Sequence, residues 1–158
     1  MNGFKFQHEV RVRYSEIDGQ KLVYHGHYLT YFDCAMVEYF RERLQLDASG
    51  QSLEDVFELA LVKTTLEFAK PARLDDRLAV WCRVDRTGRS SLDMDFKITR
   101  AGDETPLVTG RTVYVHFDAG STMARPIPVS VLKAILEYEG ADDSGIARAT
   151  IAEASPVS

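Results

Sequence analysis

The chain has 158 residues, of which 45% are hydrophobic and 27% are charged, and its formal net charge is −5. This length predicts one domain with a substantial core, and the acidic balance argues against a protein that binds nucleic acid. No apolar run approaches the ~18 residues that a membrane span needs, and residues 1–10 lack the features of a signal peptide, so we expect no membrane span and a cytoplasmic location. The two cysteines, Cys34 and Cys82, lie in apolar patterns, which predicts buried reduced thiols and no disulfide.

The first third of the chain predicts a strand, a loop and a long helix. Apolar residues roughly alternate over residues 4–14, which indicates a strand, and a polar loop containing Gly19 follows. From about His27 to Leu44, apolar residues recur at steps of three and four. The apolar surface of this helix is wider than one stripe, so we expect other elements to wrap around it.

A short helix and a series of strands are predicted next. Ser49 or Ser52 is placed to cap a helix that reaches Leu59. Four segments with alternating apolar residues then predict strands at 61–69, 77–86, 91–100 and 107–119. The short turns between them favour an antiparallel sheet with one buried face. In the last of these strands the alternate apolar residues are Val113, Val115 and Phe117.

The end of the chain predicts a short amphipathic helix that contains Val131, Leu132, Ile135 and Leu136. Beyond residue 139 the sequence is small and polar, which is typical of a tail. The expected organisation is one α+β domain at 1–139 and a tail at 140–158, with about five antiparallel strands curled around the long helix.

An isolated carboxylate, Asp18, lies in the loop before the long helix. A helix start presents unpaired N–H groups and a partial positive charge, which can hold a developing oxyanion. A carboxylate facing that helix start can act as nucleophile or general base on the atom bound there. The alternative is that Asp18 only shapes a turn with Gly19, as Asp–Gly pairs often do.

The first forty residues carry a resemblance to a known family. RYSEID at 13–18 and VYHGHYL at 23–29 form its motif, and residues 68–76 and 88–91 support it more weakly. With these segments, residues 5–137 resemble the hot-dog fold, in which a curved antiparallel sheet wraps one central helix. Within that fold the chain looks like the 4-hydroxybenzoyl-CoA thioesterase family and its bacterial acyl-CoA thioesterase relatives. It departs from the family at Lys21, where a Gly is usual three positions after the Asp.

The resemblance implies an enzyme that hydrolyses an acyl-CoA thioester to the free carboxylic acid and CoA. It implies that Asp18 attacks the thioester carbonyl or activates the water that does. By position, the backbone N–H of His25 is the expected oxyanion donor. No cofactor and no metal are expected, apart from the CoA that is part of the substrate.

The resemblance also suggests residues that contact substrate. The acyl pocket is expected to be lined by Val23, Tyr24 and Tyr28, with core packing as the alternative for each. The pantetheine or phosphates of CoA are expected to meet Arg89, Ser90 and Ser91. Other basic residues that suit a phosphate are Lys70, Arg73, Arg77 and Arg86.

The sequence offers two alternative catalytic sites, a helical glutamate and a zinc site, and supports each of them less well than the site at Asp18. A related thioesterase branch uses a helical Glu, but Glu38 lies roughly 15 Å along the helix at 1.5 Å per residue, too far from the helix start. We expect Glu38 to form a salt bridge or a dimer contact. A zinc site made from Asp18, His25 and His27 lacks a fourth ligand at suitable spacing.

Two other functions stay open on the sequence. One is a hot-dog hydratase or dehydratase acting on an acyl thioester, and the other is a non-catalytic acyl-CoA-binding domain. A half-open sheet also leaves an edge, so we expect self-association into a dimer or tetramer. A homotetramer with active sites at subunit interfaces is the form that fits the resembling family. The sequence does not fix the acyl group.

Overall fold

The computed structural model describes residues 3–43 and 58–140, and the chain clusters into two compact units. The first unit comprises Met1–Tyr39, Thr65–Arg83 and Asp95–Arg111. The second comprises Phe40–Thr64, Val84–Met94 and Thr112–Ser158. Strands β2 to β5 each contribute residues to both units, so each unit is described by itself below.

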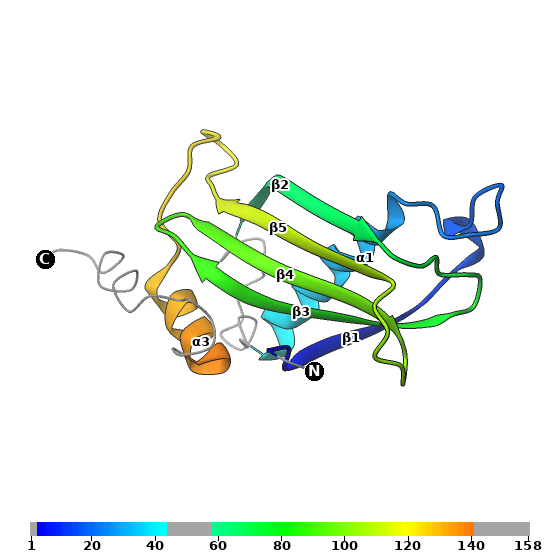
Figure 1. Ribbon diagram of the computed structural model, residues 1–158. Coiled ribbons are helices and arrows are strands. Elements are labelled where there is room, and N and C mark those ends of the chain that lie inside the picture. The colour runs from blue at the N-terminus through cyan, green and yellow to red at the C-terminus, as the bar shows by residue number, and fades with distance from the viewer. Residues whose placement is uncertain (1–2, 44–57, 141–158) are drawn as a thin grey trace, which may run out of the picture. The chain divides into compact units, whose positions relative to one another are not determined.

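The strands form one antiparallel sheet in the described part of the chain (Figure 1). They are β1 (Phe6–Arg11), β2 (Leu59–Phe68), β3 (Arg77–Thr87), β4 (Ser91–Arg100) and β5 (Val108–His116). Their order across the sheet is β1-β3-β4-β5-β2, which leaves β1 and β2 at the edges. Phe6 lies opposite Cys82 and Arg11 lies opposite Arg77, so β1 runs antiparallel to β3. The predicted sheet is confirmed.

The period-two pattern of the sequence matches the burial of β3 and β4. The alternate residues are at most 2% exposed, and they are Leu78, Val80, Cys82, Val84, Leu92, Met94, Phe96 and Ile98. A buried parity of this kind requires one face of the sheet to be covered.

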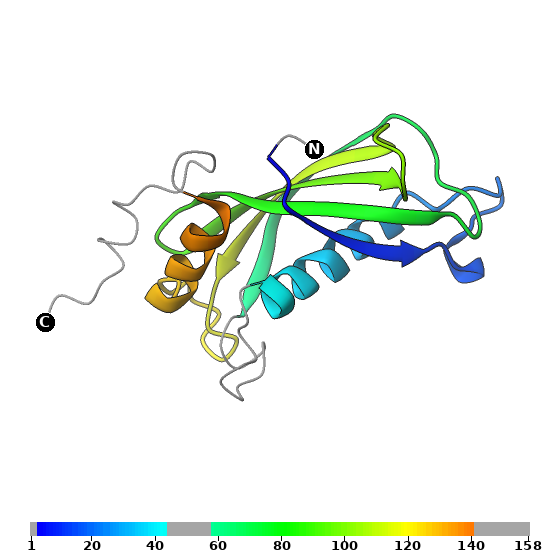
Figure 2. The ribbon, with the colours of Figure 1, turned by 90° about the horizontal axis from the view of Figure 1, so that it is seen from below.

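In the first unit that cover is helix α1 (His27–Glu38), which lies along one face of the sheet (Figure 2). The ring of Phe32 stacks on that of Phe96 with centroids 4.4 Å apart and an interplanar angle of 12°. The thiol of Cys82 lies 3.7 Å from the carbonyl oxygen of Ala35, as a weak hydrogen bond. Both sheet residues come from the parity that the sequence marks as apolar.

A glycine on β5 makes the close approach of α1 possible. A Cβ placed on Gly110 would lie 2.5 Å from Cε2 of Phe32 and 3.1 Å from the carbonyl oxygen of Thr65. Neither a packed ring nor a backbone carbonyl can give way cheaply, so any side chain at this position would push the helix or β2 outward.

Several boundaries differ from the sequence expectation. The first strand ends at Arg11, and Tyr14–Glu16 form a short 3₁₀ helix where a strand end and a loop were expected. Helix α1 ends at Glu38, and a π-helical stretch, Tyr39–Arg43, follows it directly. The expected short helix lies mostly outside the described residues, but Leu59, its expected end, already belongs to β2.

Two expectations about burial are wrong. On β5 the buried parity is that of Thr112, Tyr114 and His116, whereas Val113 and Val115 are half-buried. Polar side chains can occupy the buried face here because they find partners: the hydroxyls of Thr112 and Thr64 lie 3.2 Å apart. The other error is Cys34, which is exposed on α1, whereas Cys82 is buried as expected.

In the second unit the helix expected near the end of the chain is α3 (Val129–Glu139). Its residues Val131, Leu132 and Ile135 are fully buried, which confirms the amphipathic pattern. The buried carboxylate of Glu139 accepts a hydrogen bond from the backbone N–H of Val84 at 3.2 Å, which ties the end of α3 to β3.

The loop before α1 is closed at its base by an isolated bridge between Ile17 and Val23. Within it, the backbone N–H of Asp18 donates to the carbonyl of Leu22 at 2.9 Å, and that of Lys21 donates to the carbonyl of Asp18 at 3.0 Å. Lys21 has φ +62°, in the left-handed region that glycine adopts without cost. The backbone therefore keeps a glycine-type turn at the position where the resembling family usually has Gly.

We predict that Gly110→Ala lowers the free energy of unfolding by about 1–3 kcal/mol, because the new methyl group overpacks the site between Phe32 and β2. Urea unfolding followed by circular dichroism measures this. Gly120→Ala is the control, since its Cβ would make only an ordinary contact of 3.5 Å with Asp118, and we expect it to change stability far less. Equal effects of the two variants would contradict the prediction.

We predict that Lys21→Gly raises the free energy of unfolding by about 0.5–1 kcal/mol, because glycine removes the strain of a left-handed Lys. The matched control is Gln20→Gly in the same loop, where φ is not positive and added chain entropy should lower stability instead. The same urea titration reads both. A loss of stability in Lys21→Gly would show that the Lys side chain itself holds the loop.

Candidate functional site

A hollow of about 320 Å³ opens in the first unit beside the start of α1. Its walls come from the loop before the helix, the first turn of the helix, and the segment that follows β2. The residues that line it are Asp18, Gln20, Leu22, Val23, His25, Tyr28, Phe68, Ala69, Lys70 and Pro71. Of the residues expected at the site, the hollow brings together Asp18, His25, Val23 and Tyr28.

The carboxylate of Asp18 is held by its own loop. Its Oδ1 accepts hydrogen bonds from the backbone N–H of Gln20 at 2.8 Å and from that of Leu22 at 3.4 Å. Asp18 is half-buried, and Oδ2 has no hydrogen-bond partner among residues 3–43 and 58–140. Asp18 thus shapes the turn with one oxygen, and the other oxygen is available to the hollow.

His25 lies immediately before α1, and its side chain is exposed. Its ring lies against the ring of Tyr24, with centroids 4.2 Å apart. No acceptor in the described part of the chain pairs with the backbone N–H of His25, while that of His27 donates to the carbonyl of Tyr24 at 2.9 Å. The helix start therefore has an unpaired backbone donor on a residue that lines the hollow.

Tyr28 and Val23 form the buried floor of the hollow. The backbone N–H of Ala72 donates to the hydroxyl of Tyr28 at 3.1 Å, and burial raises the pKa of that hydroxyl. The backbone N–H of Val23 donates to the carbonyl of Ala72 at 3.0 Å. The ring of Tyr28 also contacts that of Phe68, at 5.7 Å between centroids. Tyr24, by contrast, is 47% exposed and does not line the hollow.

A buried carboxylate that sequence reasoning missed lies two residues before Asp18. Glu16 is 3% exposed, and its Oε1 accepts from the backbone N–H of Arg13 at 2.8 Å and from the hydroxyl of Tyr31 on α1 at 2.9 Å. Burial raises the pKa of Glu16, but these hydrogen bonds and the Arg13 guanidinium outweigh it, and the net pKa is lowered. Burial and the bond to Glu16 raise the pKa of Tyr31. The sequence did hold a signal for this buried carboxylate. The motif contains a second acidic residue, and the apolar helix that follows contains a tyrosine.

The residues expected to meet CoA lie in the second unit, at the turn between β3 and β4. The carbonyl of Arg89 accepts from the N–H of Ile127 at 2.9 Å, and that of Ser90 accepts from the N–H of His116 at 2.7 Å. The carbonyl of Ser91 accepts from the N–H of Gly88 at 2.8 Å. These backbone contacts fix the turn, and the side chain of Arg89 is exposed. A role in binding CoA stays a prediction.

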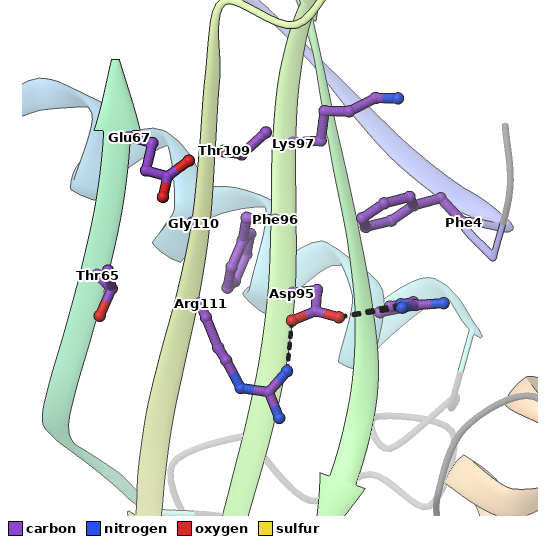
Figure 3. A pocket seen from close by; sticks show the side chains of 10 residues that line it. Phe4, Thr65, Glu67, Asp95, Phe96, Lys97, Thr109, Gly110 and Arg111 are labelled. Carbon is purple, nitrogen blue, oxygen red and sulfur yellow. Dashed lines mark hydrogen bonds and ion pairs between the residues drawn. The ribbon is translucent and has the colours of Figure 1, made fainter. Parts of the chain in front are cut away.

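A second hollow, of about 340 Å³, lies on the face of the sheet turned away from α1 in the first unit (Figure 3). At its centre the carboxylate of Asp95 accepts from Arg83 at 3.1 Å and from Arg111 at 2.8 Å. The Arg83 guanidinium also lies 5.2 Å from the centre of the Phe4 ring. Here the carboxylate is already engaged by two guanidinium groups, so it is a poorer base or nucleophile than Asp18.

Two features are absent from residues 3–43 and 58–140. None of the helices there is long and apolar enough to cross a membrane. The same residues contain no group of three His, Cys, Asp or Glu side chains placed to hold a metal ion.

Comparisons with known proteins identify the family. The sequence model of the Thioesterase superfamily matches residues 20–107, which is more than half of the chain. The acyl-CoA thioesterase YbgC of Haemophilus influenzae is 35% identical over 101 residues, which cover 63% of this chain and 71% of that protein. The acyl-CoA thioester hydrolase YbgC of Escherichia coli O6:H1 is 29% identical over 133 residues, 84% of this chain and 96% of that protein.

A solved structure supports the same conclusion. The crystal structure of a thioesterase from Thermus thermophilus, complexed with coenzyme A and Zn, superposes with a TM-score of 0.74 at 26% identity. The match covers 89% of this chain and 98% of that one. The sheet and helix described above are therefore a hot-dog fold, as the resemblance implied. The chain belongs to the thioesterase superfamily and is a thioesterase of that fold.

Proposed function

We propose that the protein is an acyl-CoA thioesterase in which Asp18 and the start of α1 form the catalytic site. The observation that carries the proposal is that one hollow is lined by both the half-buried Asp18 and by His25, whose backbone N–H is unpaired in the described residues. The names of the YbgC relatives, acyl-CoA thioesterase and acyl-CoA thioester hydrolase, support the substrate class. The thioester carbonyl oxygen would accept from the N–H of His25 as negative charge develops on it.

The reaction needs one group to attack the carbonyl carbon and one to hold the oxygen. Asp18 has an oxygen for the first task, because Oδ1 is held by the loop amides and Oδ2 faces no partner in the described residues. As general base, Asp18 takes a proton from water, hydroxide adds to the carbonyl carbon, and the C–S bond breaks to release CoA as a thiolate that is then protonated. As nucleophile, Asp18 forms a mixed anhydride with loss of the thiolate, and water then hydrolyses the anhydride. Both routes use the same oxyanion donor, whose removal typically costs ~3 kcal/mol of barrier.

Substrate contacts follow from the walls of the hollow. The buried side chains of Val23 and Tyr28 face the acyl group, and Phe68 extends that apolar surface. Lys70 lines the same hollow and supplies a cation there for a carboxyl or phosphate group. Tyr24 has an indirect role: its ring packs against the ring of His25, the residue that carries the proposed oxyanion donor. We retain Arg89, Ser90 and Ser91 as contacts for CoA.

We also propose that the protein self-associates through β2, as expected from its exposed sheet edge. In the described part of the chain, β2 is an edge strand of the sheet, and Leu61, Val62 and Phe68 on it are 49%, 59% and 55% exposed. An exposed apolar edge strand readily pairs with another strand. A second copy of the chain would cover these side chains and satisfy the unpaired edge, in a dimer or in a tetramer built from dimers.

We predict that Asp18→Asn lowers thiol release from acyl-CoA by about 100-fold or more, because Asn keeps the turn acceptor but loses the basic oxygen. A panel of aliphatic and aromatic acyl-CoAs with a thiol reagent measures this. Asp103→Asn is the control, since Asp103 likewise accepts from a loop N–H two residues on, Thr105 at 2.8 Å, but lies outside this hollow.

The control variant should keep the rate of the wild-type protein. Full activity of Asp18→Asn would contradict the proposed site. If no acyl-CoA releases thiol but enoyl absorbance changes, the protein is a hydratase or dehydratase instead. Binding of acyl-CoA without any turnover would favour the non-catalytic binding domain.

We predict that Val62→Glu shifts the protein toward the monomer, because a carboxylate on an exposed edge strand opposes pairing with another copy. Size-exclusion chromatography with light scattering gives the mass. Lys63→Glu changes charge on the same strand at an already polar, exposed position and should shift the mass less. A monomeric wild-type protein would exclude this part of the proposal.

A further inference from the structure

We infer that Glu16 is a positioning residue for Asp18, and that it acts through its hydrogen bond to Tyr31. This inference rests on the proposed catalytic role of Asp18. Glu16 is buried and does not line the hollow, so we assign it no contact with the substrate. What it does touch is the helix whose start carries the proposed oxyanion donor.

The geometry ties two segments of the chain together. The Oε1 atom of Glu16 accepts from the hydroxyl of Tyr31, which lies one helical turn after His27, the first residue of α1. The backbone carbonyl of Glu16 accepts from the N–H of Tyr24 at 2.9 Å. Glu16 therefore bonds both to the chain that enters α1 and to the second turn of the helix.

The same residue orders the chain on its other side. Oε1 also accepts from the backbone N–H of Arg13 at 2.8 Å, and Oε2 accepts from the Arg13 side chain at 3.1 Å. These bonds cap the 3₁₀ helix Tyr14–Glu16 that leads into the loop. Between Glu16 and Tyr24 lies the closed loop, in which Asp18 directly follows the residue that starts the Ile17–Val23 bridge.

The backbone at the entry of the loop is also bonded locally, where the N–H of Ile17 donates to the carbonyl of Tyr14 at 3.2 Å. The loop is held from outside by the bond from Val23 to the carbonyl of Ala72, which secures its exit. Its entry, on the side of Asp18, follows directly from Glu16. Displacing a catalytic group by about 1 Å can greatly lower the catalytic rate. A change at Glu16 that shifts Asp18 should therefore lower the rate, although the two side chains have separate hydrogen-bond partners.

Because the Glu16–Tyr31 hydrogen bond is buried, water cannot replace it. Glu16 is 3% exposed and Tyr31 is 3% exposed, so neither group can turn to water for a replacement partner. In Glu16→Gln the side chain keeps its shape, but an amide cannot accept at both of its polar atoms. Either the Arg13 guanidinium or the pair formed by the Arg13 N–H and the Tyr31 hydroxyl then faces another donor.

The test measures kcat and KM for Glu16→Gln with the acyl-CoA that the wild-type protein cleaves best, with rates normalised to the folded fraction from circular dichroism. We expect kcat to fall about 10-fold and KM to change less than about 2-fold. Glu139→Gln is the matched control: Glu139 is also 3% exposed and also accepts a backbone N–H, but it belongs to α3 in the second unit. Its kcat per folded molecule should equal that of the wild-type protein.

A double-mutant cycle separates positioning from general damage. In an Asp18→Asn background, Glu16→Gln should lower the residual rate less than about 2-fold, because the group that it positions is already gone. If Glu16→Gln does not fold, Tyr31→Phe removes the hydrogen bond between Tyr31 and Glu16 directly while keeping the ring. It should give the same fall in kcat and the same loss of effect in the Asp18→Asn background.

Three results would overturn the inference: unchanged kcat in Glu16→Gln or Tyr31→Phe, an equal fall in kcat in the Asp18→Asn background, or an equal fall in Glu139→Gln. Each of these is distinct from failure of the proposed function, which would be seen as full activity of Asp18→Asn alone.

Discussion

The packing of Phe32 into the sheet is the contact on which the first unit depends. Its ring stacks on Phe96, and the space it fills exists because Gly110 has no side chain. This contact sets how closely α1 approaches the strands, and hence where the start of the helix lies. The hollow beside Asp18 is built on that helix start and on the segment after β2, so the site inherits its dimensions from a hydrophobic contact that takes no part in chemistry.

Two carboxylates in one short segment illustrate how environment assigns a role. Glu16 is buried, and its oxygens accept from a backbone amide, a tyrosine hydroxyl and a guanidinium. Asp18, two residues on, is half-buried and uses one oxygen to accept from loop amides. The first arrangement stabilises a fixed structure, and the second leaves a lone pair available at a cavity. The number of surrounding donors thus separates a carboxylate that anchors the chain from one to which we assign the reactive role.

Much of this structure follows from sequence patterns. The alternation in β3 and β4, the three- and four-residue steps in α1 and the amphipathic α3 each have one dominant physical cause, the burial of one face, and were predicted correctly. On β5 the pattern misled, because Thr112 and His116 are buried with hydrogen-bond partners that come from other segments of the chain. Hydrogen bonds between distant segments produce no regular spacing of apolar residues, so the sequence pattern does not reveal them.

The site was predictable in part for the same reason. The motif placed Asp18, His25, Val23 and Tyr28 near one another, and one hollow gathers them. The buried position of Glu16 was not predicted, since its hydrogen-bond partner Tyr31 lies fifteen residues later, on another element. Lys21 is a similar case: the sequence shows a missing glycine, but only the backbone shows that the left-handed turn is kept.

The exposure of Cys34 has a practical consequence. It is an accessible thiol on α1, whereas the thiol of Cys82 is buried against the backbone of the same helix. Partial desolvation of the thiol and the neighbouring carboxylate of Asp33 raise the pKa of Cys34, so alkylation proceeds best in mildly alkaline solution. A fluorophore attached there would sit on the helix whose start lines the hollow, and it would test whether that helix moves on ligand binding without any engineered cysteine.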